Sequence, residues 1–213
     1  MRKILGKIIM IVGGVMIFFA LLLTVFCSYQ EVKAGEWADT ARDRLISRIP
    51  GYSEKLTVTN KKDDDSRAVP VYELNPDVKM STIPVTVNTI ELNYIGILRA
   101  PSIGLELPVI ADWSYYNLNF APCCFSGSAY QGNFVICAHN YAAHFGSLDR
   151  VSPDDTIVFT DIGGNNFFYT VESIDILEPA DIDEMISEEY DLTLFTCTFS
   201  GQARVAVRCK KTE

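Results

Sequence analysis

A cysteine, an arginine and a histidine stand at the ends of apolar stretches in this chain, and together they could perform acyl transfer. Residues 193–197 read Thr-Leu-Phe-Thr-Cys, so Cys197 ends a short apolar run. Arg204 follows seven residues later, at the head of the next run, and His139 ends a separate apolar stretch 58 residues before the cysteine. The three residues form a candidate catalytic set.

The chemistry of acyl transfer needs these residue types. A cysteine attacks a carbonyl carbon as its thiolate, and a nearby imidazolium or guanidinium favours that anion. An imidazole near its own pKa can donate a proton to a departing amine. An arginine stays charged and can hold an oxyanion with its forked donors.

Simpler interpretations exist for each residue type. An unpaired cysteine at the end of an apolar strand is more often a buried small hydrophobe than a nucleophile. Of the two histidines, His144 falls in an expected loop or short helix and is predicted to be a surface residue. Arg208 shares a strand face with Arg204, but about 13 Å of strand separates them, so only one can reach the thiol. Three arginines are therefore expected to be solvated: Arg99, Arg150 and Arg208.

The pattern that must position these residues is rich in β-structure. Short apolar or alternating runs are separated by clusters of glycine, proline, asparagine and aspartate, which is typical of strands and turns. Seven or eight such strands predict a closed barrel, with helices possible at 113–120 and 182–187. The expected strands are 94–99, 105–110, 134–139, 156–160, 167–176, 192–197 and 205–209.

The amino end predicts a membrane anchor. Residues 8–27 carry no charge, and twenty helical residues can cross a hydrocarbon core of about 30 Å. Basic residues precede this run, which keeps the N-terminus cytoplasmic and places the remainder outside. A cleaved signal peptide is the alternative, but the bulky Phe26 disfavours a small-residue cleavage site.

Between the anchor and the β-rich region, the pattern predicts a stalk. Near-helical apolar spacing indicates an amphipathic helix over 31–48, stopped by Pro50, and a charged run at 61–67 with scattered prolines suggests a linker. The predicted organisation has four parts: a cytoplasmic N-terminus (1–7), a single transmembrane signal-anchor (8–27), a juxtamembrane helix and linker (28–93) and a catalytic β-barrel (94–213).

Charge and cysteine usage limit the partners. The formal net charge is −9 overall and −12 for the residues after 27, which argues against nucleic acid and against an anionic membrane surface as partners. Five cysteines follow the anchor, an odd number that leaves at least one thiol unpaired. The other four are open to disulfide formation or reduction: Cys123, Cys124, Cys137 and Cys209. Zinc is poorly supported because paired CxxC spacing is missing, and no cofactor is expected.

Over residues 94–210 the sequence resembles the sortase family. The Thr-Leu-Phe-Thr-Cys motif ending at Cys197, with Arg204 opening the next strand, is similar to the family signature. The segments 95–109 and 169–179, and Phe-Gly-Ser-Leu at 145–148 after the histidine, follow the family's order. Ala138 stands where the family often has glycine. The resemblance implies a mainly β fold, a closed seven- or eight-stranded sortase-like barrel.

The resemblance implies transpeptidation at the cell surface. Cys197 would be the nucleophile, His139 the general acid and then base, and Arg204 the clamp for the oxyanion or substrate. The implied partners are exported proteins with a C-terminal sorting motif similar to Leu-Pro-any-Thr-Gly and an amine acceptor such as a peptidoglycan precursor. No Asp-Pro-aromatic lid motif is seen, which disfavours the pilin-polymerising class, and a housekeeping or class D-like enzyme is favoured.

Two other functions fit parts of the pattern. A papain-like peptidase acting on peptidoglycan would be an exported cysteine enzyme, but it usually places its cysteine before the histidine and on a helix. A non-catalytic, membrane-tethered β-domain would not need the three residues in register. The reactivity of the Cys197 thiol separates these alternatives from acyl transfer.

Overall fold

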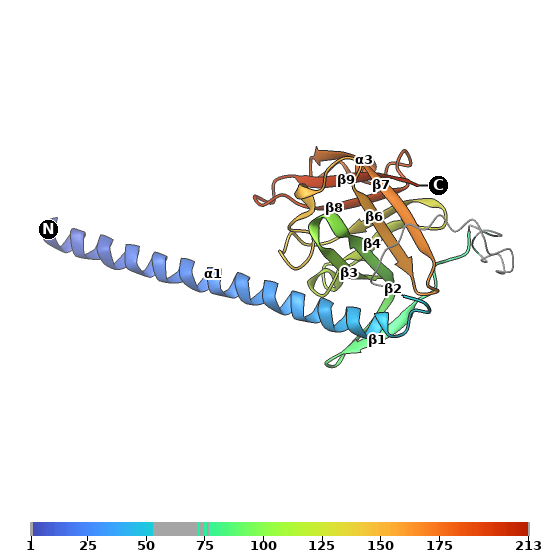
Figure 1. The fold of residues 1–213 in the computed structure, drawn as a ribbon. Helices are drawn as coiled ribbons and strands as arrows, with labels where there is room; N and C mark the ends of the chain where they lie inside the picture. The colour runs from blue at the N-terminus through green and yellow to red at the C-terminus, as the bar shows by residue number, and fades with distance from the viewer. Residues whose placement is uncertain (1, 53–71, 73–74, 76, 213) are drawn as a thin grey trace.

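A long N-terminal helix and a barrel of β-strands make up the computed structural model of the chain (Figure 1). The structure describes residues 2–52, 72, 75 and 77–212. The expected linker therefore lies largely outside the described residues, including its charged run at 61–67. The C-terminus lies on the side of the barrel opposite to the N-terminal end of the helix (Figure 1).

Within the described residues, nine strands pair into one sheet. The strands are β1 (Ile83–Val87), β2 (Ile90–Ala100), β3 (Leu105–Ile110), β4 (Cys123–Ser128), β5 (Gly132–Cys137), β6 (Thr156–Asp161), β7 (Asn166–Leu177), β8 (Leu192–Cys197) and β9 (Arg204–Lys211).

The sheet closes on itself. Its order is β1-β2-β3-β4-β5-β8-β9-β7-β6, and β6 pairs back onto β2, where Ile97 lies opposite Thr160. Strands β2 to β9 thus form the closed ring, which confirms the predicted sortase-like barrel. β1 is an additional strand that pairs only with the first half of β2, where Val87 lies opposite Ile90. The ring is least extensively paired between β3 and β4, where the parallel contact consists of Ile110 opposite Cys123.

Three strands differ from the prediction. β1 and the start of β2 fall within 28–93, so the β-domain begins earlier than residue 94. β4 was not predicted, because its Cys-Cys-Phe-Ser-Gly-Ser sequence does not alternate and its pairing with β5 is interrupted by register shifts. The expected helix at 113–120 is wrong: only a short 3-10 turn forms, at Asn117–Asn119. A short helix, α3 (Ile182–Met185), does form in the second predicted region.

The N-terminal helix α1 (Arg2–Ile46) is continuous, where the sequence suggested two separate helices. No glycine or proline stands between residues 27 and 34, so nothing ends the helix after the apolar run. The run is long and apolar enough to cross a membrane. Beyond it, one side of α1 packs on the barrel through small and aliphatic side chains, and these are Ala34, Ala38, Ala41 and Leu45. The helix stops before Pro50 and Gly51, whose positive φ of 66° suits glycine.

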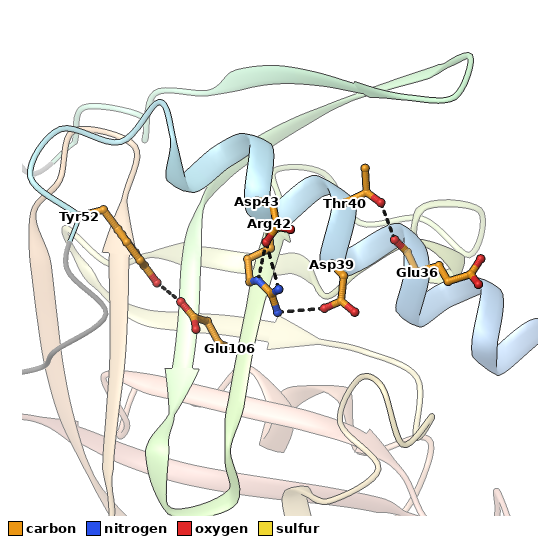
Figure 2. A network of polar contacts seen from close by, with 7 residues as sticks. All are labelled: Glu36, Asp39, Thr40, Arg42, Asp43, Tyr52 and Glu106. Carbon is orange, nitrogen blue, oxygen red and sulfur yellow. Dashed lines mark hydrogen bonds and ion pairs between the residues drawn. The ribbon is translucent and has the colours of Figure 1, made fainter.

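α1 also makes polar contacts (Figure 2). Arg42 forms ion pairs with Asp39 at 2.9 Å and Asp43 at 3.0 Å along the exposed side of the helix. Arg44 and Arg48, one turn apart, donate hydrogen bonds to the carbonyl oxygens of Thr86 and Pro84 on β1. Residues one helical turn apart are about 6 Å apart, which matches the spacing of alternate strand residues. The helix is therefore fixed along the strand as well as against the barrel.

Candidate active site

The parallel pairing of β5 and β8 brings the candidate histidine to the candidate cysteine. Cys137 lies opposite Phe195, so two residues further along both strands His139 comes level with Cys197. Because the carboxyl ends of parallel strands meet at one edge, both side chains reach the same end of the barrel. Both residues are partly exposed, as a group that meets substrate must be.

The antiparallel pairing of β8 and β9 places Arg204 directly opposite Cys197. Directly opposite residues on an antiparallel pair share a face, with Cβ atoms about 5 Å apart. The guanidinium Nη1 of Arg204 donates to the carbonyl oxygen of Ala203 at 3.1 Å and to that of Gly201 at 3.4 Å. These bonds hold the arginine beside the loop that joins the two strands.

Two side-chain hydrogen bonds tie the histidine segment to the cysteine strand. The Thr196 hydroxyl, which is buried, donates to the carbonyl oxygen of Ala138 at 2.9 Å. The Asn140 amide donates to the carbonyl oxygen of Thr198 at 3.2 Å. The residues on both sides of His139 are therefore bound to the residues on both sides of Cys197.

The three predicted residues line one cleft of about 220 Å³. Aromatic and aliphatic side chains from β4, β8, α3 and the connections supply most of its wall, so it can receive an apolar peptide segment. No sequence pattern assigned these residues to the site, although Trp113, Tyr115 and Ile182 are unusually exposed for their type. The wall residues are Trp113, Tyr115, Leu118, Phe125, Pro179, Ile182, Met185 and Phe195.

Burial sets the protonation of the histidine. It lowers the pKa of His139 below its ordinary value, because the imidazolium loses water in the cleft. The resting imidazole is therefore neutral at neutral pH, and its ring lies 4.8 Å from the ring of Tyr141, centroid to centroid. A neutral imidazole can accept a proton but carries no charge of its own. Of the three residues, Arg204 is therefore the one that places a permanent positive charge beside the thiol.

The other barrel cysteines are unlike Cys197. All six cysteines lie in the described residues and none forms a disulfide. Burial raises the pKa of Cys123 to about 12 and that of Cys124 to about 11, and it also raises the pKa values of Cys137 and Cys209. Thiols in this state are protonated and poorly reactive. Cys137, which shares the cleft, is 2% exposed and fills the core beside the site.

His144 is buried beneath α1, which corrects the prediction of a surface residue. It is 2% exposed, and within the described part of the chain neither ring nitrogen makes a hydrogen bond. Its ring lies 5.6 Å from that of Tyr141, whose ring also contacts His139 at a tilt. Burial, followed by the charge of His139, lowers the pKa of His144 to about 4. The sequence could not show that the anchor helix covers this loop.

Acid should therefore destabilise the domain through His144. The unfolded chain binds a proton near pH 6.5 and the folded chain only near pH 4, so stability falls as pH decreases across this window, by up to roughly 3 kcal/mol. His144→Leu should remove most of this loss. Urea unfolding of both proteins at pH 7 and pH 4.5 measures it, and an equal pH dependence in the two would contradict the assignment.

Arg99 and Arg208 are also buried, which corrects the prediction that they are solvated; Arg150 is exposed as expected. Arg208 is 1% exposed, and its guanidinium donates to Asp175 at 3.1 Å, to Thr193 at 3.1 Å and to the carbonyl oxygen of Glu184 at 2.7 Å. It holds the connection around α3 against β9. Arg99 donates to the Thr160 hydroxyl at 3.0 Å.

Removing Arg208 should cost more stability than removing any exposed arginine. Arg208→Met leaves Asp175 and three further acceptors without their cation, and we expect a loss of roughly 3 kcal/mol or more in the free energy of unfolding. Arg150→Met, at an exposed position, is the matched control. Denaturant titration followed by tryptophan fluorescence decides it, and equal midpoints for both variants would show that the buried network contributes nothing.

Among the described residues, no group of three or more His, Cys, Asp or Glu side chains is placed to hold a metal ion. The absence of a cofactor stays a prediction.

Comparisons with known proteins show which family the chain resembles in sequence and in fold. A family model described as Sortase domain matches residues 98–212. Clostridium perfringens sortase C, solved with the C-terminal cell wall sorting motif, superposes with a TM-score of 0.52 at 27% identity, covering 59% of this chain and 74% of that one. Streptococcus pneumoniae sortase C gives 0.51 at 26% identity, covering 56% and 68%.

Sortase A from Corynebacterium diphtheriae superposes with a TM-score of 0.52 at 24% identity, a likeness of fold. The match covers 59% of this chain and 63% of that protein, less than two thirds of its length. Comparison with curated proteins gave no match. Because the Sortase domain match extends over more than half of the 213 residues, the chain belongs to the sortase family.

Proposed function

We propose that the chain is a membrane-anchored cysteine transpeptidase that cleaves a C-terminal sorting motif of exported proteins and transfers the acyl part to a cell-wall amine. The observation that carries the proposal is the meeting of Cys197, His139 and Arg204 in one apolar cleft. Family membership and the sorting motif in the Clostridium perfringens sortase C structure support the same chemistry.

The first half of the reaction forms a thioester. His139, neutral at rest, accepts the thiol proton, and the Cys197 sulfur bonds to the carbonyl carbon of the motif's threonine. Arg204 stabilises the negative charge on the carbonyl oxygen with its planar donors. The C–N bond to the following glycine then breaks, and His139 returns the proton to the departing amine.

The second half regenerates the enzyme. The acceptor amine bonds to the thioester carbonyl carbon and loses a proton to His139, again through an oxyanion held by Arg204. The C–S bond breaks, and the sulfur leaves as thiolate and is reprotonated. The aliphatic and aromatic wall of the cleft favours a motif whose residues before the threonine are apolar.

The N-terminal helix places the proposed enzyme at the membrane. The apolar part of α1 crosses the membrane once, and the basic residues before it keep the N-terminus in the cytoplasm. The catalytic domain then lies outside the cell, where exported substrates and lipid-linked acceptors are found. The order of histidine before a strand-borne cysteine disfavours the papain-like alternative.

A peptide library tests the function directly. The purified protein is incubated with peptides that vary around Leu-Pro-any-Thr-Gly, and intact mass is measured after acid quenching. We expect the mass to increase by the acyl part of the recognised peptide, and the increase to disappear when an amine acceptor is added. A thiol that no peptide acylates, and that reacts with an alkylating reagent no faster than a model thiol, would favour the non-catalytic alternative.

A further inference from the structure

The anchor helix enters the catalytic domain without an intervening linker. α1 continues from the apolar run that ends at Cys27 into the segment buried on the barrel, which begins at Ala34. At 1.5 Å per residue, Glu31 lies only about 6 Å beyond Cys27 along the helix axis. The helix therefore fixes how far each part of the domain lies from the end of the apolar run.

The loop that follows His139 lies against the part of α1 just after the apolar run. The backbone N–H of Ala142 donates to the Glu31 carboxylate, and a Cβ added at Gly35 would come within 2.9 Å of the Cβ of Ala143. Burial raises the pKa of Tyr141, and the neighbouring Cys27 and Glu31 raise it further. The catalytic end of the barrel is thus the part that lies beside the end of the apolar run.

The loop between β8 and β9 belongs to the same end. Thr198 is bonded to Asn140, next to the loop that contacts α1, and the following residue, Phe199, is fully exposed at 102%. In Figure 1 the N-terminal end of α1 and the C-terminus lie on opposite sides of the barrel. β9 ends near the C-terminus, so the loop before β9 lies on the side of the barrel from which the apolar part of α1 extends. An aromatic side chain without packing partners in water is well suited to a membrane interface.

We propose that the catalytic end of the domain rests on the lipid bilayer, with Phe199 inserted into the outer leaflet beside α1. The proposal rests on the membrane anchor of the proposed function. The interfacial layer is about 5–7 Å thick on each side of the hydrocarbon core, which matches the height of Glu31 and the loop bonded to it. The cleft then opens at the membrane surface. Because the domain is acidic, insertion depends on the aromatic ring and needs no anionic lipid.

Quenching by brominated lipid tests this arrangement on the full chain. The protein is reconstituted in nanodiscs of zwitterionic phosphatidylcholine, with or without bromine on the acyl chains. Tryptophan is introduced as Phe199→Trp, and the emission of the unsubstituted protein, with its two native tryptophans, is subtracted. We expect the bromine to remove most of the added emission and the added emission to be shifted to the blue.

Two further variants make the outcome decisive. Ser47→Trp, exposed just after the C-terminal end of α1 and nearly 30 Å beyond Cys27, should not be quenched. Leu22→Trp, within the apolar run, should be quenched strongly. Quenching at Leu22 without quenching at Phe199 overturns the proposal and leaves the anchor intact. Absence of quenching at both positions removes the anchor and overturns the proposal with it, while the peptide-acylation assay separately decides the catalytic function.

Discussion

Cys197→Ala should abolish both cleavage of a sorting peptide and transfer to an amine. The alanine cannot form the thioester, and the remaining barrel thiols cannot substitute, because burial raises their pKa values and keeps them protonated. Intact-mass spectrometry after incubation with a recognised peptide should show no acyl adduct. The fold should be unchanged, since the side chain is only partly buried.

Cys137→Ala is the matched control, because this cysteine lines the same cleft from the neighbouring strand. It should keep substantial acylation activity and lose some stability, as expected for a shortened core side chain. An acyl adduct on the Cys197→Ala protein would refute the nucleophile assignment. If the adduct then disappears in the double variant, Cys137 is the nucleophile.

Arg204→Lys should reduce peptide cleavage by roughly two to three orders of magnitude, the usual effect of losing an oxyanion donor. Lysine keeps the positive charge, but its three donors share one nitrogen and cannot reproduce the planar, separated donors with which the guanidinium can bind the Ala203 and Gly201 carbonyl oxygens and an oxyanion together. The loss should fall on kcat/KM, with unfolding stability little changed.

Arg150→Lys is the appropriate control for this measurement, because it is exposed and lies outside the cleft. Arg208→Lys is not suitable, since its buried network supports the fold and any loss of activity would be mixed with unfolding. Equal cleavage rates for Arg204→Lys and Arg150→Lys would remove Arg204 from the site.

Strands with clear alternation could be predicted from the sequence, and strands without it could not. β7 and β8 were placed to within a residue because their apolar and β-branched residues follow the period of a strand. β1 contains Pro84 and was assigned to the linker, because proline is tolerated only at sheet edges, a position that the sequence does not reveal. β4 is interrupted by Gly127, whose φ of 71° breaks the pattern.

The three candidate catalytic residues could be predicted because each ends or begins a recognisable strand in a familiar motif. Their meeting depends on β5 pairing with β8 in parallel, which is a long-range contact that local patterns do not encode. The cleft wall was missed because Trp113, Phe125 and Ile182 come from three separate parts of the chain. The roles of the catalytic residues stay predictions until the variants are measured.

The sequence predictions were wrong mainly for buried polar residues, which were expected to lie at the surface. His144 and Arg208 looked like surface groups because their sequence neighbours are mixed and nothing local indicates what covers them. In the structure α1 covers the loop of His144, and the connection around α3 covers Arg208. Both coverings are tertiary contacts that override residue-type preference.

Arg44 on α1 and Arg48 just after it cover the outer edge of β1, through which copies of the protein could otherwise pair. β1 has a strand neighbour on one side only, and Arg44 and Arg48 occupy carbonyl oxygens that a second chain would otherwise use to add a strand. A soluble fragment cut after residue 27 keeps this cover. A fragment cut after residue 48 exposes the edge, together with the apolar surface on which Ala41 and Leu45 packed, and should polymerise through intermolecular β-pairing.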